Sequence, residues 1–220
     1  MPERIEKLGP QRAREIAAID VEARAGDFLP SLGEDFLTAL YVEMLRGTES
    51  FAYGVIGESM ELLGFVVGCT DTEAVFHRLS PVRNWAMFQA TARALRKEPT
   101  RLVRMAESAF YTSKDPTHLP AELVVMGVKS GLRSHGFGAK LVAALAQDLA
   151  ARGVSRYRVT VKTKNDGALR FYQKNHFRKA AEFRLYGEPW QILAAETKEQ
   201  LAALHGNGES RGVSPTARPS

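Results

Sequence analysis

The most constraining feature of the sequence is a segment in which a strand, a glycine-rich turn and an amphipathic helix follow one another. Residues Ala121–Val128 are mostly apolar and rich in valine, which favours a strand. Residues Gly136–Arg152 carry three leucines spaced four residues apart and are followed by a glycine, which favours a helix that ends there. A strand and a helix joined by so short a turn predict an α/β fold.

The turn itself reads Arg133-Ser134-His135-Gly136-Phe137-Gly138. Backbone amides in the first turn of a helix have no partner within the helix and attract anions. The amides in this position belong to Gly136, Phe137, Gly138 and Ala139. The two glycines would let a pyrophosphate approach the backbone, and Arg133 adds a positive charge. Arg-x-x-Gly-x-Gly is expected by chance about 0.1 times in such a chain, so an ordinary glycine-rich turn stays an alternative.

The remaining elements follow from hydrophobic spacing and from turn residues. Strands are expected at Glu3–Leu8, Phe51–Ile56, Glu61–Cys69, Tyr157–Lys162, Phe177–Tyr186 and Trp190–Ala195. Helices are expected from Gly9-Pro10 to Gly26, from Ser31 to Gly47, over two or three pieces of 72–110, and at Asn165–Asn175. Ser31 and Glu34 have the spacing of a capping box. The order is mixed α/β, with a hairpin at residues 51–69.

The chain of 220 residues, 45% of them hydrophobic, predicts one domain at residues 1–204. A helical insert at about 72–110 would shape a ligand site or a homodimer interface. Residues 205–220 are rich in Gly, Ser, Pro and Arg and poor in large apolar side chains, which predicts a disordered tail.

Two segments resemble motifs of the GNAT superfamily of N-acetyltransferases. Val128–Leu141 resembles its motif A, and Asn165–Tyr172 resembles the helix that covers the pantetheine arm of the donor. The resemblance covers Glu122–Tyr186. It implies a central, mostly antiparallel sheet with one splayed parallel pair and helices on both faces, here with an extra helical insert before motif A. It also implies that the chain is an acyltransferase that uses acetyl-CoA.

The resemblance further implies where acetyl-CoA binds. It would lie between strands Ala121–Val128 and Tyr157–Lys162, with main-chain groups of Met126 and Val128 free to bind the pantetheine and polarise the thioester. A bulge at Gly127 would free these groups. The side chain of Asn165 would bond the pantetheine arm, and the pyrophosphate would lie on the Arg133–Ala139 turn.

Two residues are the candidates for catalysis in the resemblance. Glu122 lies where many members carry a glutamate that takes a proton from the amine, although an exposed glutamate at a strand start is an alternative. Tyr172 lies where members commonly carry a tyrosine that protonates the leaving thiolate. The sequence departs from the family at His176-Phe177, which replaces Gly-Phe; His176 is interpreted as a helix-ending residue with positive φ.

The sequence constrains the identity of the acceptor less than that of the donor. An amino sugar or another small amine, a protein N-terminus or lysine, and a polyamine all stay open, as does a non-catalytic CoA-binding module. The net charge of +5 suits coenzyme A but also nucleic acid. A basic cluster that could bind nucleic acid, or form a solvated helix face, comprises Arg93, Arg96, Lys97, Arg101 and Arg104. Residues that could line an acceptor pocket, or belong to the core, are Phe28, Leu29, Phe36, Tyr41, Trp85 and Phe88.

The cysteine count and the absence of long apolar runs limit the metal sites and the cellular location that we expect. Cys69 is the single cysteine, which excludes an intramolecular disulfide and a multi-cysteine zinc site, so no metal is expected. No apolar run is long enough to span a membrane, and the N-terminus lacks the pattern of a secretion signal. We therefore expect a cytoplasmic protein without a membrane partner.

Overall fold

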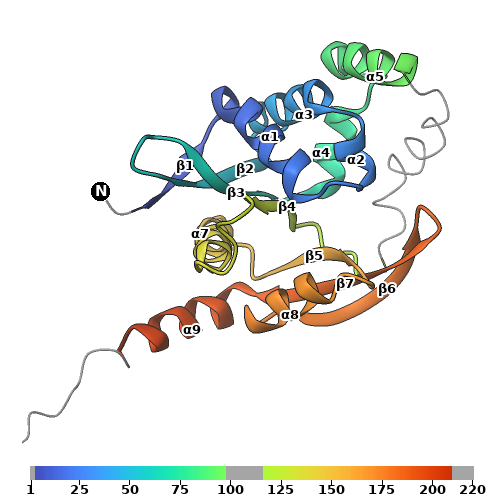
Figure 1. Ribbon diagram of the computed structural model, residues 1–220. Coiled ribbons are helices and arrows are strands. Elements are labelled where there is room, and N and C mark those ends of the chain that lie inside the picture. Colours follow the sequence, from blue (N-terminus) through green and yellow to red (C-terminus); the bar gives the residue numbers. More distant parts are fainter. Residues whose placement is uncertain (1–2, 98–115, 210–220) are drawn as a thin grey trace, which may run out of the picture.

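A computed structural model describes residues 3–97 and 116–209 of the chain. Seven strands form one sheet, in the order β1-β2-β3-β4-β5-β7-β6 (Figure 1). The strands are Arg4–Leu8 (β1), Ser50–Ile56 (β2), Leu62–Cys69 (β3), Glu122–Val128 (β4), Arg156–Lys162 (β5), Arg178–Leu185 (β6) and Glu188–Glu196 (β7).

Every pair of neighbouring strands is antiparallel except β4 and β5, which are parallel. Only Glu122 with Arg158 and Leu123 with Val159 are in register between β4 and β5, so the two strands separate after their first residues. The predicted mixed α/β fold with a mostly antiparallel sheet and a splayed parallel pair is confirmed.

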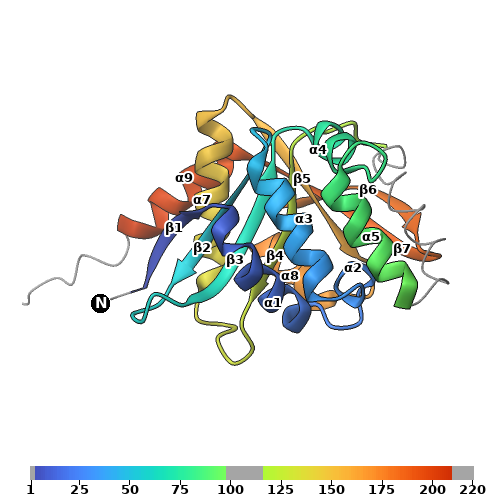
Figure 2. The ribbon, with the colours of Figure 1, turned by 90° about the horizontal axis from the view of Figure 1, so that it is seen from above.

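Helices cover both faces of the sheet, as the two perpendicular views show (Figures 1 and 2). A short 3-10 helix at Pro10–Arg12 precedes the first of them. The helices of one face are Ala13–Ala23 (α1), Phe28–Ser31 (α2), Glu34–Arg46 (α3), Thr72–Leu79 (α4) and Trp85–Lys97 (α5). Those of the other face are Phe137–Ala151 (α7), Asp166–Lys174 (α8) and Thr197–Glu209 (α9).

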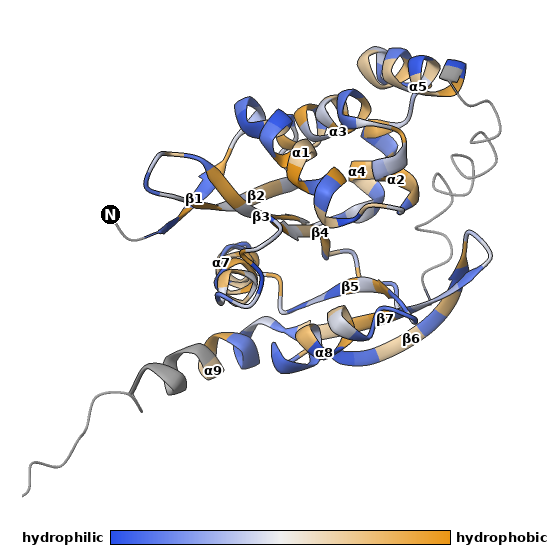
Figure 3. Cartoon of the chain, viewed as in Figure 1, coloured by the Kyte–Doolittle hydropathy of each residue, from blue (hydrophilic) through white to orange (hydrophobic). Residues whose placement is uncertain are grey.

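Each face has its own apolar core, because side chains alternate along every strand. Phe65 and Val67 of β3 pack against α1 and α3, whereas Val66 packs on the opposite face against the leucines of α7. Hydrophobic residues mark both α1 and α7 (Figure 3). The sheet is therefore held from two sides, and the gap between β4 and β5 lies between the two cores.

The start of α3 differs from the predicted capping box. Ser31 ends the short helix α2, and its hydroxyl donates a hydrogen bond to the Phe28 carbonyl at 2.6 Å. Gly33, with a φ of 97°, precedes α3, and no side chain caps the helix. The capping-box prediction was wrong because Ser31 lies in α2, a helix that the spacing of apolar residues did not reveal, and Gly33 is the residue that precedes α3.

The bulge of β4 also lies elsewhere than predicted. Val125 pairs with Val67 and Leu123 pairs with Gly68, so Val124 is the extra residue. Gly127 pairs in register with Phe65. A Cβ at Gly127 would come within 2.9 Å of the Phe65 ring and 3.4 Å of Ala23 and Ile19 side-chain atoms of α1. The glycine thus permits the close approach of α1 to the sheet.

The helical segment after β3 is described in part. Helices α4 and α5 lie within the predicted insert, whereas residues 98–115, with Arg101 and Arg104 of the basic cluster, lie outside the described residues. At the other end, α9 continues past Leu204, where the sequence predicts the tail to begin. Residues 210–220 are not described.

Candidate active site

The glycine-rich turn leads from β4 into the N-terminus of α7. Gly136 precedes the helix with a φ of 81°, a left-handed conformation that glycine adopts without steric cost. No side chain caps α7, and its first turn contains no acidic residue. The amides of Phe137, Gly138 and Ala139 therefore carry the partial positive charge of a helix N-terminus, which suits an anion.

Close packing fixes this helix end. Phe137 is buried and anchors α7 in the core. A Cβ at Gly138 would come within 2.9 Å of the Phe171 ring, so the missing side chain brings α8 against the first turn of α7. The helix that carries Tyr172 is thereby held beside the turn.

Helix α1 holds the turn from the other side. The Glu22 carboxylate accepts a hydrogen bond from the Ser130 amide at 2.7 Å, and Arg133 donates to the Ala23 carbonyl at 3.4 Å. Ser134 has a φ of 71°, so the backbone before Gly136 is also left-handed. The Arg133 side chain is exposed, and its hydrogen bond to Ala23 is with the end of α1.

The separation of β4 from β5 leaves main-chain groups of β4 facing the gap. The Lys129 amide donates to the Leu63 carbonyl at 2.9 Å, in register with the pairing of β3 and β4. Because the direction of backbone groups alternates along a strand, those of Met126 and Val128 face away from β3, toward β5. Both residues lie beyond the last β4–β5 pair.

A cavity of about 310 Å³ opens where β4 and β5 diverge. Glu122 and Val124 of β4 and Thr160 and Lys162 of β5 line it. Its other walls come from the connection between α1 and α2, from α4, and from the β6–β7 hairpin. The volume is at the lower end of the roughly 300–1,000 Å³ of small-molecule sites.

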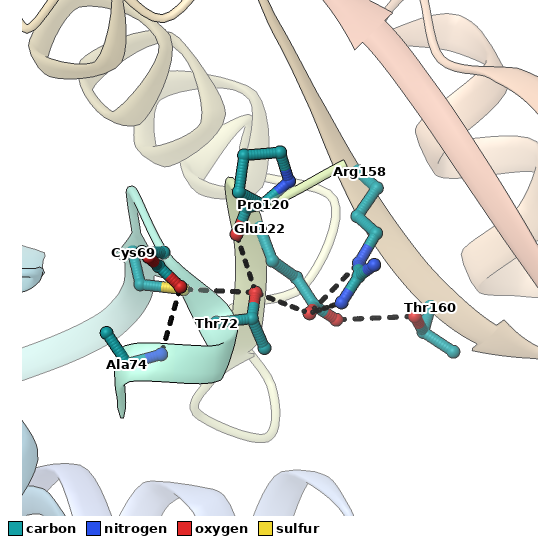
Figure 4. Close-up of polar contacts among 8 residues, drawn as sticks. Cys69, Thr72, Ala74, Pro120, Glu122, Arg158 and Thr160 are labelled. Carbon is teal, nitrogen blue, oxygen red and sulfur yellow. Dashed lines mark hydrogen bonds and ion pairs between the residues drawn. The ribbon is translucent and has the colours of Figure 1, made fainter. Parts of the chain in front are cut away.

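Glu122 lies in this cavity wall within a network of donors, as Figure 4 shows. Its Oε2 accepts hydrogen bonds from Arg158 Nη2 at 2.9 Å and from the Thr72 hydroxyl at 3.2 Å. Its Oε1 accepts from the Thr160 hydroxyl at 3.3 Å. Glu122 and Arg158 are 3% and 2% exposed, so the ion pair is buried. The alternative of an exposed glutamate at a strand start is excluded.

Tyr172 belongs to the core on the α7 face of the sheet, and Met126 and Val128 of β4 pack against the same core. The residue is buried, and its ring packs edge-on against Phe171 and Phe177, with centroids 5.2 Å from each. Burial raises the pKa of Tyr172, and the positive charge of Arg24 opposes this rise only in part. The phenol therefore stays protonated near neutral pH and can donate a proton.

The other residues that the sequence suggested for the site lie in different parts of the structure. The side-chain oxygen Oδ1 of Asn165 caps α8 by accepting from the Ala168 amide at 3.0 Å, which leaves the side-chain nitrogen Nδ2 for a ligand. His176 has a φ of 65° just after α8, so its interpretation as a helix-ending residue is confirmed. Of the suggested pocket residues, Phe28 and Leu29 line the cavity, Phe36 and Tyr41 belong to the core, and Trp85 and Phe88 are exposed on α5.

Three residues at or behind the cavity wall were not predicted from the sequence. Arg158 pairs with Glu122 from the neighbouring strand, and Arg24 lines the cavity while its guanidinium binds the fully buried Asp20. A signal was present: Asp20 stands on the apolar side of α1 with Arg24 four residues later, a spacing that places the two side chains together.

Within residues 3–97 and 116–209, no group of three or more His, Cys, Asp or Glu residues could hold a metal ion. Among the helices of these residues, none has the length and apolar character needed to cross a membrane.

Comparison with solved structures gives relatives of the same fold at low identity. The ribosomal-protein-S18-alanine N-acetyltransferase of Escherichia coli is 15% identical, with a TM-score of 0.57 over 89% of this chain and 94% of that chain. The PaiA N-acetyltransferase of Thermoplasma acidophilum, solved with coenzyme A, is 14% identical, with a TM-score of 0.56 over 89% and 99%. A chimera of the Vibrio cholerae spermidine N-acetyltransferase SpeG and hSSAT is 13% identical, with a TM-score of 0.58 over 91% and 99%.

Among curated proteins, none matches the sequence significantly. A sequence model of the acetyltransferase (GNAT) family matches residues 26–177, which is most of the chain and includes both predicted motifs. The chain therefore belongs to the GNAT family of acetyltransferases.

Proposed function

We propose that the protein transfers the acetyl group of acetyl-CoA to the primary amine of a small acceptor, by direct attack in a ternary complex. The observation that carries this proposal is the shared gap between β4 and β5. The α7 N-terminus lies at one end of it, and the cavity opens into it from the α1–α2 side. A donor and an acceptor bound in these two places would meet there.

The donor would be held mainly by backbone groups. Amides of Gly136, Phe137, Gly138 and Ala139, together with Ser134 and Arg133, would bind the pyrophosphate. Main-chain groups of Met126 and Val128 and the Asn165 amide would bind the pantetheine arm. A main-chain amide in the gap would also stabilise the oxyanion that forms on the thioester carbonyl.

The reaction needs proton movements at the amine and at the thiolate. The amine nitrogen attacks the carbonyl carbon, the C–S bond breaks, and the thiolate of coenzyme A leaves. We assign protonation of the thiolate to Tyr172, which regains a proton from the second N–H that the nitrogen loses once the C–N bond has formed. We assign removal of the ammonium proton to Glu122 through Oε1, because Thr160, which donates to that oxygen, also lines the cavity.

Substitution of Gly136 tests the donor site. Gly136→Ala should weaken coenzyme A binding about tenfold or more, because a Cβ would stand where the phosphate approaches the backbone. The substitution also strains a left-handed residue, at a cost of about 1–2 kcal/mol. Isothermal titration calorimetry with coenzyme A measures the affinity.

Gly153→Ala is the matched control. Gly153 follows the other end of α7 with a φ of 79°, and a Cβ at either glycine meets open space. Both variants should therefore lose similar stability, whereas only Gly136→Ala should lose affinity. Equal affinities in the two variants would exclude the turn as the phosphate site.

A panel of amines tests the transfer itself. The protein should release the thiol of coenzyme A from acetyl-CoA only when an amine is present, and mass spectrometry should find the acetyl group on that amine. The panel should include amino sugars, amino acids, polyamines and peptides with free N-termini or lysines. A protein that binds coenzyme A but acetylates none of them would instead be a binding module.

The cytoplasmic location and a homodimer formed through the insert stay predictions. Helix α5 exposes Trp85 and Phe88, whose stacked rings are 5.2 Å apart, on the surface that such a dimer would use. Gel filtration with light scattering measures the oligomeric state.

A further inference from the structure

Arg24 carries a fixed positive charge at the wall of the cavity. It follows α1, and its Nε and Nη2 donate to the two carboxylate oxygens of Asp20 at 2.5 and 2.7 Å. The Tyr41 hydroxyl donates to the same carboxylate at 2.6 Å. Asp20 and Tyr41 are 0% and 2% exposed. A buried carboxylate and a buried phenol therefore hold the guanidinium in one orientation.

The guanidinium keeps donors for a ligand. Arginine has five N–H groups, and Asp20 uses those of Nε and Nη2. Both hydrogen bonds of the guanidinium to Asp20 lie on its Nε–Nη2 edge, while the side chain is 29% exposed and lines the cavity. A planar guanidinium in this position suits the oxygens of a carboxylate or a phosphate.

The other charges of the cavity wall favour an anion over a second cation. Lys162 lies 2.8 Å from Asp27 and 3.3 Å from Glu188, and Glu122 pairs with Arg158. Each of the three carboxylates that line the cavity is thus paired with a cation. A polyamine would bring further positive charge toward Arg24 and Lys162, whereas an anionic group would find donors.

The position of Arg24 limits the distance between the acceptor's amine and its anion. Arg24 and Glu122, the base assigned to the amine, line the same cavity of about 310 Å³. An anion bound to Arg24 and an amine that gives its proton to Glu122 would therefore share this small space. The amine that attacks the thioester must be separated from that anion by only a few bonds.

The remaining wall is apolar apart from Tyr186 and Lys164, and Lys164 pairs with Glu188. Phe28, Leu29 and Phe76 line one side, and Leu185 and Trp190 line the other. Together with the volume of about 310 Å³, this wall suits one apolar or aromatic side chain.

We propose that the acceptor is an α-amino acid with an apolar or aromatic side chain and that its carboxylate binds Arg24. The proposal rests on the acetyl transfer proposed above. The amine nitrogen would face the thioester. The side chain of the amino acid would pack against the apolar part of the cavity wall, between the α1–α2 connection and the β6–β7 hairpin.

Matched pairs of amines test the proposal on the unmodified protein. Phenylalanine and phenethylamine, or tryptophan and tryptamine, differ only in the carboxylate. We expect kcat/KM to be about 10- to 100-fold higher for the amino acid of each pair, as for a hydrogen bond to a charged group. Equal values within the pairs, or faster acetylation of glucosamine or spermidine, would overturn the amino acid proposal while acetyl transfer would stand. If no amine is acetylated, the transfer proposal itself fails.

Variants of Arg24 test whether this residue binds the carboxylate of the acceptor. Arg24→Gln should lower kcat/KM for phenylalanine at least tenfold and change that for phenethylamine by less than about threefold, which removes the preference. Because Arg24→Gln leaves the buried Asp20 charge unpaired, Asp20→Asn with Arg24→Gln provides a second variant without either charge. Arg14→Met, on the exposed side of α1, is the control, since that side chain is 82% exposed. If Arg24→Gln lowers kcat/KM for phenylalanine and for phenethylamine by a similar factor, Arg24 does not bind the carboxylate.

Discussion

Replacement of Tyr172 by phenylalanine is expected to lower kcat about a hundredfold with little change in the affinity for acetyl-CoA. The substitution removes only the hydroxyl, and a general acid commonly contributes about 10²- to 10⁴-fold to the rate. The aromatic contacts with Phe171 and Phe177 would remain. Steady-state kinetics give kcat, and calorimetry with coenzyme A gives the affinity of the donor.

Tyr157→Phe is the matched control for this prediction. The Tyr157 ring packs edge-on against Phe177 at 5.2 Å, as Tyr172 does, but its hydroxyl donates to Gln200. The control should lose about 1 kcal/mol of stability with its buried hydrogen bond and keep its kcat. If Tyr172→Phe and Tyr157→Phe show the same kcat as the unmodified protein, Tyr172 is not the acid.

The pH profile provides a second test of Tyr172. Since burial raises the pKa of this phenol above its usual value near 10, the phenol stays protonated in the folded protein below about pH 10. We expect kcat/KM for the acceptor to rise with pH as the amine loses its proton, without a falling limb below about pH 10. A falling limb near pH 8 in the unmodified protein, absent in Tyr172→Phe, would contradict this.

Replacement of Glu122 by glutamine is expected to lower the free energy of unfolding by about 3–5 kcal/mol, because it leaves Arg158 as an uncompensated buried charge. The two side chains are nearly inaccessible, and two threonine hydroxyls also donate to the carboxylate. Urea denaturation followed by circular dichroism measures the loss. A change below about 1 kcal/mol would show that the pair is solvated in solution.

The same variant tests the assignment of Glu122 as the base. At temperatures where it is folded, Glu122→Gln should lose activity near neutral pH, with the alkaline rise of its rate moved upward. Arg158→Lys keeps a positive charge beside the carboxylate but loses the planar guanidinium, so it should lose stability without moving the alkaline rise. Glu122→Gln combined with Arg158→Met should be more stable than Glu122→Gln alone. Identical pH profiles of Glu122→Gln and Arg158→Lys would remove the base assignment.

Contiguous features were predictable from the sequence. The strand at Ala121–Val128, the glycine-rich turn and the helix at Gly136–Arg152 lie next to one another in the chain, and each carries its own local signal. Their order alone predicted a helix N-terminus that follows a strand, and the structure confirms this arrangement. The mixed sheet with one splayed parallel pair followed from the resemblance carried by this segment and by Asn165–Tyr172.

Features that depend on contacts between distant residues were not predictable in this way. Glu122 and Arg158 meet because two parallel strands pair for only two residues, and no local pattern specifies that register. Gly127 was expected to mark a bulge, but its missing side chain serves the packing of α1, and the bulge lies at Val124. The orientation of Arg24 depends on Tyr41, which belongs to a different helix from Asp20.

Direct attack on acetyl-CoA is tested most directly by initial-rate kinetics in which acetyl-CoA and the best amine of the panel are both varied. Attack within a ternary complex predicts double-reciprocal lines that intersect, because both substrates must be bound before coenzyme A is released. Parallel lines, together with release of coenzyme A before any amine is added, would show an acetylated form of the protein and would contradict direct transfer.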